Sequence, residues 1–363
     1  MCLCILIYNN AIKIFLKQAT PVVVGVDSKK EKIVLLWNAF YKETAYGLGD
    51  FGRNAFTKNK CKVDNCRLET NRSLLEEAAA VVFHVNGKDM DRFPRRTNRG
   101  QLFVYFLREP PPYASRFSRK YTDQFNLTMT YLHDSDIPIP ISRVVQRVAG
   151  EIVDVKPYHT KYPASSRSRD VAWMVSHCDT ASKRHVYVKA LSRYINVDVY
   201  GACGNLRCAK KQTSKCMQDL ERNYKFYLAF ENSVCDDYVT EKLYRTLAYE
   251  IVPIVYGGAD YRKLSPPNSY INILDYESPK SLAAHLKHLS ANDSAYEAFF
   301  QWKPYWKFIG NNDFLRRGFC RLCEMLNRGD VVKTYRDVHK WYVHGRCNET
   351  IVEKVVKSGK LRT

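Results

Sequence analysis

The chain has 363 residues, of which 45% are hydrophobic and 26% charged; this argues against a disordered protein and allows two domains with separate cores. Lys and Arg number 57 against 37 Asp and Glu, and the net charge of +20 favours an anionic partner such as nucleic acid, an anionic membrane surface or a phosphorylated substrate. The basic residues are spread along the chain instead of massed in an arm, which weakens the case for nucleic acid.

The first 25 residues contain two short apolar runs, at 3–8 and 11–16, which asparagine and lysine residues interrupt. Neither run approaches the ~20 apolar residues of a membrane-spanning helix, and no small-residue cleavage site of a signal peptide follows. We therefore expect residues 1–25 to be a degenerate membrane anchor, unless the chain lacks its true start.

Apolar segments and helical patterns alternate over the next part of the chain. Strands are predicted at residues 33–37, 79–83 and 102–107, with a helix over 73–78. The prolines at 110–112 end the third strand, because proline cannot continue a strand interior. This alternation predicts parallel α/β layering and a first Rossmann-like domain over residues 26–160.

A polar stretch at 150–170, rich in proline, serine and arginine, is interpreted as a linker. A second α/β series follows, and we assign residues 161–330 to a second Rossmann-like domain that faces the first across a cleft. Residues 331–363 are expected to form a C-terminal extension. The elements predicted in the second series are strands at 171–175, 197–200, 226–230 and 251–256, and helices through 187–191 and 238–249.

Twelve cysteines and four N-x-[ST] sequons favour an oxidising, glycosylating compartment. Disulfides are the preferred interpretation of the cysteines and zinc is the alternative, although their spacings match no common finger. The disulfide candidates are Cys61, Cys66, Cys203, Cys208, Cys216, Cys320 and Cys323. The glycosylation candidates are Asn71, Asn126, Asn292 and Asn348.

One stretch, residues 224–258, has a pattern suited to nucleotide binding. Its strand at 226–230 leads through a polar turn into a helix whose first turn carries Glu241 and Lys242. A helix N-terminus offers free backbone N–H groups to phosphate, Lys242 adds a positive charge, and Glu241 could accept hydrogen bonds from ribose hydroxyls. The alternative is an ordinary strand–helix unit whose charged residues are solvated.

The letters of this stretch, YKFYLAFENSVCDDYVTEK, resemble the donor-binding motif of the α1,3-fucosyltransferases of glycosyltransferase family 10. Segments along most of the chain resemble other motifs of that family in the same order. They are CRLETNRS at 66–73, AAVVFH at 79–84, FNLTMTY at 125–131, DSDI at 134–137, PPNSYI at 266–271 and SPK at 278–280.

The resemblance implies a GT-B-type fold and an inverting transfer of L-fucose from GDP-fucose without a required metal, Mn²⁺ or Mg²⁺ being at most stimulatory. Glu109 matches the family's general base, although by itself it reads as an ordinary carboxylate at a strand end. His84 is a candidate on the acceptor side. The positions that match the family's GDP-fucose contacts are Arg184, Asn232, Tyr238, Glu241 and Lys242.

The resemblance also implies the lumen of the Golgi apparatus as the location, with the catalytic domain of a type II membrane protein. Where Lewis-type members carry paired histidines, this chain has His84-Val85-Asn86, and it has extra cysteines at 203, 208, 320 and 323. These departures favour the core-type branch, which modifies O3 of the innermost GlcNAc of N-glycans. Lewis-type fucosylation of LacNAc or LacdiNAc antennae remains the alternative acceptor.

Three other functions are open on the sequence. A metal-dependent glycosyltransferase could use Asp134-Ser135-Asp136 as a D-x-D site, a place that the family does not use for its donor. A Golgi protein could keep the fold and bind glycans without catalysis. The positive charge alone would fit a nucleic-acid-binding protein, although the resemblance predicts no nucleic-acid partner.

Overall fold

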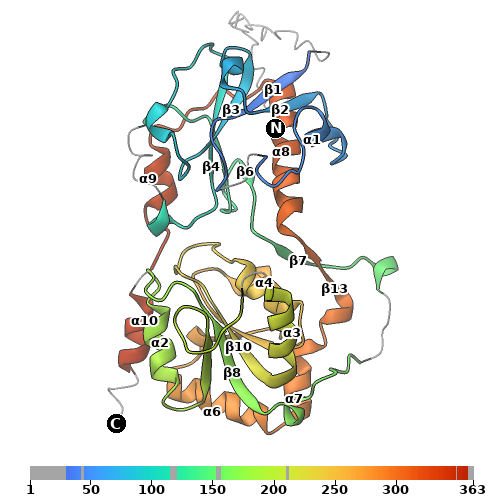
Figure 1. Ribbon diagram of the computed structural model, residues 1–363, viewed down its shortest axis with the longest axis vertical. Coiled ribbons are helices and arrows are strands. Elements are labelled where there is room, and N and C mark those ends of the chain that lie inside the picture. Colours follow the sequence, from blue (N-terminus) through green and yellow to red (C-terminus); the bar gives the residue numbers. More distant parts are fainter. Residues whose placement is uncertain are drawn as a thin grey trace, which may run out of the picture.

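The computed structural model describes residues 30–41, 45–114, 121–152, 157–209, 212–348 and 350–358. The predicted anchor, residues 1–25, lies outside these residues. In the part of the chain that is described, no helix has the length and apolarity needed to cross a membrane. The described residues form two lobes, stacked along the long axis of the molecule (Figure 1).

The first lobe contains a six-stranded parallel sheet of order β2-β1-β3-β4-β5-β6. Helices and turns cover both of its faces, so its central strands β1, β3 and β4 are almost continuously apolar, as buried parallel strands are. Its strands are β1 (Lys32–Leu36), β2 (Cys66–Glu69), β3 (Ala78–His84), β4 (Leu102–Leu107), β5 (Leu127–Thr130) and β6 (Ile137–Pro138). One face is covered by α1 (Asn54–Thr57) and α8 (Asn311–Arg328), the other by η1 (Arg72–Leu75), η2 (Met90–Arg92), η3 (Pro111–Tyr113) and α9 (Val338–Val343).

The second lobe contains a five-stranded parallel sheet of order β12-β11-β10-β8-β9. Its strands are β8 (Arg169–Met174), β9 (Val197–Tyr200), β10 (Tyr224–Phe230), β11 (Val252–Tyr256) and β12 (Ile271–Asn272). One face is covered by α2 (Arg184–Leu191), α6 (Pro279–Ser290), α7 (Asp293–Glu297) and α10 (Ile351–Ser358), the other by α3 (Thr213–Asn223), α4 (Glu241–Leu247) and α5 (Tyr261–Leu264). The predicted fold class, two Rossmann-like domains, is confirmed.

The chain passes between the two domains on opposite sides of the molecule (Figure 1). On one side β7 (Arg143–Gln146) pairs antiparallel with β13 (Trp306–Ile309). On the other side the chain descends from α9 on the first domain to α10 on the second.

The sequence assigned residues 161–330 to the second domain, but the last helix of this range, α8, packs on the first domain. α8 covers the first sheet through Leu315, Phe319 and Leu322, although it follows all five strands of the second sheet in sequence. Its apolar stripe at helical spacing indicates one buried face, but the spacing contains no information about which sheet covers it.

All seven predicted disulfide cysteines are paired, so the zinc alternative is contradicted. Two of the disulfides are long-range: Cys320 and Cys323 join α8 to Cys61 and Cys66 near the start of the first domain. Three more cysteines, which were not candidates, complete the set. The five disulfides among the described residues are Cys61–Cys320, Cys66–Cys323, Cys178–Cys203, Cys208–Cys216 and Cys235–Cys347.

Two predicted helices are shorter than expected. The segment 73–78 forms only the 3₁₀ turn η1, because the chain enters β3 already at Ala78. The segment 238–249 forms α4, which begins at Glu241.

One glycosylation candidate is contradicted. Asn126 is 7% exposed, and its Nδ2, the atom that a glycan would modify, donates to the Lys333 carbonyl at 3.0 Å. Its Oδ1 accepts from the Phe103 amide at 2.9 Å, so the side chain ties two strands and the C-terminal segment together. The other three candidates, Asn71, Asn292 and Asn348, are exposed.

Candidate active site

A cavity of about 740 Å³ lies between the two domains, as the sequence predicted. All five candidate donor-binding residues and Glu109 line it, so residues far apart in the sequence are brought together. The first domain contributes Phe40, Tyr41, Arg108, Glu109 and Ile141. The second domain contributes, among others, Arg184, Asn232, Tyr238, Glu241, Lys242 and Arg245.

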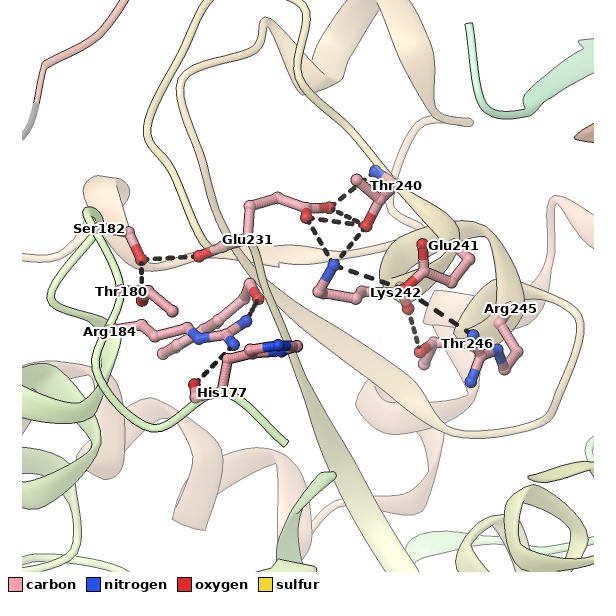
Figure 2. Close-up of polar contacts among 11 residues, drawn as sticks. His177, Thr180, Ser182, Arg184, Glu231, Thr240, Glu241, Lys242, Arg245 and Thr246 are labelled. Carbon is pink, nitrogen blue, oxygen red and sulfur yellow. Dashed lines mark hydrogen bonds and ion pairs between the residues drawn. The ribbon is translucent and has the colours of Figure 1, made fainter. Parts of the chain in front are cut away.

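The second-domain wall is organised around a fully buried carboxylate, Glu231, at the end of β10 (Figure 2). It accepts hydrogen bonds from the Thr240 amide at 2.8 Å and from the Thr240 hydroxyl at 2.8 and 3.0 Å. Burial raises the pKa of Glu231, while Lys242 acts to lower it. The side chain thus closes the loop 231–240. Because the Thr240 amide donates to Glu231, this amide is not free to bind phosphate, as an unpaired N–H at the start of a helix would be.

Lys242 is held by the same carboxylate. Its Nζ donates to the Thr240 hydroxyl at 2.7 Å and to Glu231 at 3.1 Å, and it lies 3.4 Å from Glu241 (Figure 2). Burial would lower the pKa of Lys242, but the two carboxylates outweigh burial and raise it, so the ammonium stays charged. Because an ammonium has three N–H donors, the long contact with Glu241 is the one that a ligand can most easily replace.

Arg184, the first residue of α2, lies on the other side of Glu231 from Lys242 (Figure 2). It is 4% exposed and donates to the carbonyl oxygens of Phe230 at 2.7 Å and His177 at 3.1 Å. Its Nε is buried without a hydrogen-bond partner among the described residues. Burial lowers the pKa of Arg184, with Glu231 acting in the opposite direction.

Asn232 and Tyr238 complete this wall. The Oδ1 of Asn232 is buried without a hydrogen-bond partner among the described residues. The Tyr238 ring packs edge-on against Tyr131 of the first domain, with ring centres 5.2 Å apart. Burial raises the pKa of Tyr238 well above its usual value, so its hydroxyl remains protonated and can donate a hydrogen bond.

On the first-domain wall, Glu109 follows β4 and is partly exposed to the cavity. The Tyr41 hydroxyl donates to its carboxylate, and Tyr342 donates to its backbone carbonyl at 2.5 Å. Burial raises the pKa of Tyr41, and the hydrogen bond to Glu109 raises it further.

Arg108 precedes Glu109 and was not a candidate, although an arginine beside a candidate base was a signal available in the sequence. It is 7% exposed and donates to the Pro140 carbonyl at 3.0 Å. Burial lowers its pKa to about 10, against the influence of Tyr41, Glu241 and Glu109. Arg108 therefore remains charged and adds a cation from the first domain to the same cavity.

His84 does not reach the cavity, contrary to its expected place on the acceptor side. It is 2% exposed and packs edge-on against Phe40, with Tyr41 also in ring contact. Its Nδ1 lies 3.2 Å from the Ala39 carbonyl. Burial lowers its pKa to about 4, so the ring is neutral at physiological pH. His84 supports the two aromatic residues that line the cavity.

The D-x-D aspartates lie outside the cavity and serve the fold. Asp136 accepts from the Thr128 amide at 2.8 Å and pairs with Lys333. Asp134 pairs with Arg346 at 2.6 Å.

The cavity is thus lined by the cations Arg108, Arg184, Lys242 and Arg245 and by the carboxylates Glu109 and Glu241. The buried carboxylate of Glu231 holds Lys242 from behind this wall. Clustered cations of this kind favour a ligand with several negative charges, such as a diphosphate. The partly exposed Glu109 provides a proton acceptor on the facing wall.

This architecture defines the fold class: two Rossmann-like domains that face a cavity, the GT-B type. A crystal structure of an α1,3-fucosyltransferase superimposes with a TM-score of 0.56 at 16% identity, over 84% of this chain and 92% of that chain. A crystal structure of α1,3-fucosyltransferase with GDP-fucose gives 0.54 at 17% identity, over 85% and 93%.

The family model described as "Glycosyltransferase family 10 (fucosyltransferase) C-term" matches residues 164–341 of this chain. The family model described as "Fucosyltransferase, N-terminal" matches residues 29–142. The chain belongs to glycosyltransferase family 10.

Curated relatives agree with this assignment. Alpha-(1,3)-fucosyltransferase C of Drosophila melanogaster is 32% identical over 86% of this chain and 77% of its own length. Glycoprotein 3-alpha-L-fucosyltransferase A of the same organism is 34% identical over 87% of this chain, which spans 61% of that relative. A human relative, 3-galactosyl-N-acetylglucosaminide 4-alpha-L-fucosyltransferase FUT3, is 32% identical over 77% of this chain and 75% of its own length.

Proposed function

We propose that this protein transfers L-fucose from GDP-β-L-fucose to O3 of a GlcNAc residue in the N-glycan core, with inversion at the fucose C1. The observation that carries the proposal is the single cavity with Arg184 and Lys242 on one wall and Glu109 on the other. Family membership and the α1,3-fucosyltransferase names of the relatives support both the sugar donor and the reaction.

The second-domain wall holds the donor. Arg184 and Lys242 neutralise the diphosphate, and Lys242 exchanges its long contact with Glu241 for a phosphate oxygen. Glu241, at half exposure, then accepts hydrogen bonds from the ribose hydroxyls, and Asn232 and Tyr238 line the pyrophosphate or fucose side. As the bond from C1 to the phosphate oxygen breaks, fixed cations stabilise the negative charge that develops on the departing GDP.

Glu109 acts as the general base. The acceptor O3 attacks the fucose C1 while its proton passes to the Glu109 carboxylate, so one C–O bond forms as the other breaks. The resulting carboxylic acid returns its proton to water after the products leave. Tyr41, which donates to Glu109 in the present structure, orients the carboxylate for this transfer.

Asp134 and Asp136 are engaged by Arg346 and Lys333, and this supports a reaction that needs no metal at the D-x-D triplet. Transfer is therefore expected to persist in EDTA.

The lumen of the Golgi apparatus is the proposed location, with the catalytic domain anchored as a type II membrane protein. Five disulfides among the described residues support an oxidising compartment. A glycoprotein acceptor is in keeping with the name of the second Drosophila relative.

The decisive experiment is incubation with GDP-fucose and a panel of defined N-glycans and LacNAc or LacdiNAc glycans, with the products identified by mass. A mass increase of one fucose on a core glycan that lacks antennae supports the proposal. Modification of antennae alone would assign the chain to Lewis-type fucosylation. Glycan binding without transfer would indicate a non-catalytic protein.

A further inference from the structure

Residues 342–348, here called the C-terminal strap, connect the two walls of the cavity. The strap leaves α9 on the first domain and runs towards α10 on the second (Figure 1). It lies across the molecule from the β7–β13 pair, so the domains are joined on both sides.

On the second-domain side, the strap is bonded to the donor loop, residues 231–240. Cys347 forms a disulfide with Cys235 in the middle of this loop, and the two residues also form an antiparallel bridge. The Asp236 amide donates to the Arg346 carbonyl, and the Asn348 amide donates to the Val234 carbonyl, each at 2.8 Å.

On the first-domain side, the strap begins with Tyr342, which contacts Glu109, the proposed general base. The hydroxyl of fully buried Tyr342 donates to the Glu109 backbone carbonyl at 2.5 Å. Arg346 pairs with Asp134 at 2.6 Å.

The packing between these contacts is continuous. Cys235 and Tyr238 of the donor loop are buried in the same apolar cluster as Tyr342 and Tyr131, which otherwise belongs to the first domain. The donor loop is thus fixed at one end by Glu231 in the second domain and in its middle by the first domain and the strap.

We propose that Tyr342 and the Cys235–Cys347 disulfide are positioning residues, which set the Glu109 carboxylate in register with the donor loop. Transfer requires the base and the donor to be placed relative to each other although they lie on different domains. A misplacement of about 1 Å can cost about 10²-fold in rate. The strap is the covalent path that contacts both groups.

The first test is Tyr342→Phe, with Tyr296→Phe as the matched control. Tyr296 is also fully buried and donates to a backbone carbonyl, that of Lys225, at 2.5 Å, but at the far end of β10 from the cavity. We expect Tyr342→Phe to lower kcat about tenfold, within the range of small misplacements, with GDP affinity unchanged. Tyr296→Phe should keep both values.

Tyr342→Phe is then made in a protein that already carries Glu109→Gln. Because Tyr342 acts through Glu109, the residual turnover should change less than about twofold there, as expected for residues acting as one unit. An equal loss in both backgrounds, or an equal loss in the Tyr296 control, would overturn the proposal, since the effect would then be one of general stability.

The second test removes the disulfide with Cys235→Ala/Cys347→Ala, and Cys61→Ala/Cys320→Ala is the control from within the first domain. Hydrogen exchange is expected to rise in residues 231–240 and around Glu109 together, and only in the strap variant. Exchange that rises in the loop alone, or in neither segment, would refute the coupling.

The kinetic test rests on the proposed function, whereas the exchange test does not. A wild-type protein that transfers no fucose would defeat the proposed function, and the exchange pattern would still decide whether the strap couples the two walls.

Discussion

The two walls of the cavity differ in how their charged groups are held. On the second-domain wall, Glu231 is fully buried and bonded to both Thr240 and Lys242. On the first-domain wall, Glu109 is partly exposed, and the described hydrogen bond to its side chain comes from one tyrosine hydroxyl.

This difference fits the role proposed for each wall. Cations that stabilise a leaving diphosphate act best when they are already fixed in place, since no reorganisation is then needed during the reaction. A base must instead stay open to the acceptor and exchange its proton with water. The same site therefore combines a rigid wall with an accessible one.

The largest expected effect tests the accessible wall. Glu109→Gln keeps the shape of the side chain and removes its basicity, so turnover should fall roughly 10²–10⁴-fold, the usual scale of general-base loss. GDP affinity, measured by calorimetry, should be unchanged because the donor contacts lie on the other wall. Turnover within a few-fold of the wild type would show that another group is the base.

His84, which packs behind Phe40 and Tyr41 of the first-domain wall, should make the stability of the protein sensitive to acid. The pKa of His84 is lowered from 6.5 to about 4 by burial, so the unfolded chain binds this proton at a higher pH than the folded chain does. Stability is therefore lost as the pH falls from about 6.5 to 4, by about 3 kcal/mol at one pKa unit per 1.36 kcal/mol.

Urea unfolding at pH 7 and pH 4 measures this loss of free energy of unfolding. The variant His84→Gln lacks the titrating ring, so its loss over the same pH range gives the contribution of the carboxylates alone. The wild type should lose more stability than the variant. Equal losses would mean that His84 is not held neutral.

The rigid wall should respond to substitution in two distinguishable ways. Arg184→Ala and Lys242→Ala should each weaken GDP binding about 10–100-fold, since hydrogen bonds to charged groups contribute about 1.5–3 kcal/mol. Lys242→Ala should also lower the free energy of unfolding, because Glu231 is then buried without its cation. Wild-type GDP affinity in both variants would contradict the donor site.

A companion variant separates the two effects. Adding Glu231→Gln to Lys242→Ala removes the unpaired charge, so stability should recover while GDP affinity stays low. Recovery of both would indicate that Lys242 acts through folding alone.

Much of the rigid wall could be predicted from sequence, because its residues follow one strand and open one helix. Asn232, Glu241 and Lys242 lie within a single motif, and local order brings them together. The apolar strands, such as β1, β4 and β11, were also predictable, since buried parallel strands appear as short apolar runs. Among the strands with polar residues in alternation or of only two residues, β2, β5, β6 and β12 were not predicted.

The accessible wall and the strap were less predictable. The contacts of Tyr41 and Tyr342 with Glu109 join positions 68 and 233 residues apart, and neither tyrosine lies in a recognisable pattern. His84 shows the converse limit, since a histidine at a strand end reads equally well as a ligand-binding residue or as part of the core.

The smallest expected effect concerns Tyr41, whose hydroxyl donates to the carboxylate of the proposed base. Its side chain is 60% exposed, so the hydrogen bond to Glu109 competes with water and contributes about 1 kcal/mol. Tyr41→Phe keeps the ring that covers His84 and removes only the hydroxyl, so kcat should fall about fivefold while GDP affinity and Tm stay constant. Tyr194→Phe, at an exposed tyrosine just after α2, is the control, and it should leave kcat unchanged. A loss as large as that of Glu109→Gln would place the Tyr41 hydroxyl in the proton transfer itself. An unchanged or faster reaction would show instead that the acceptor displaces Tyr41 before the chemical step, and that the accessible wall is organised by its substrate.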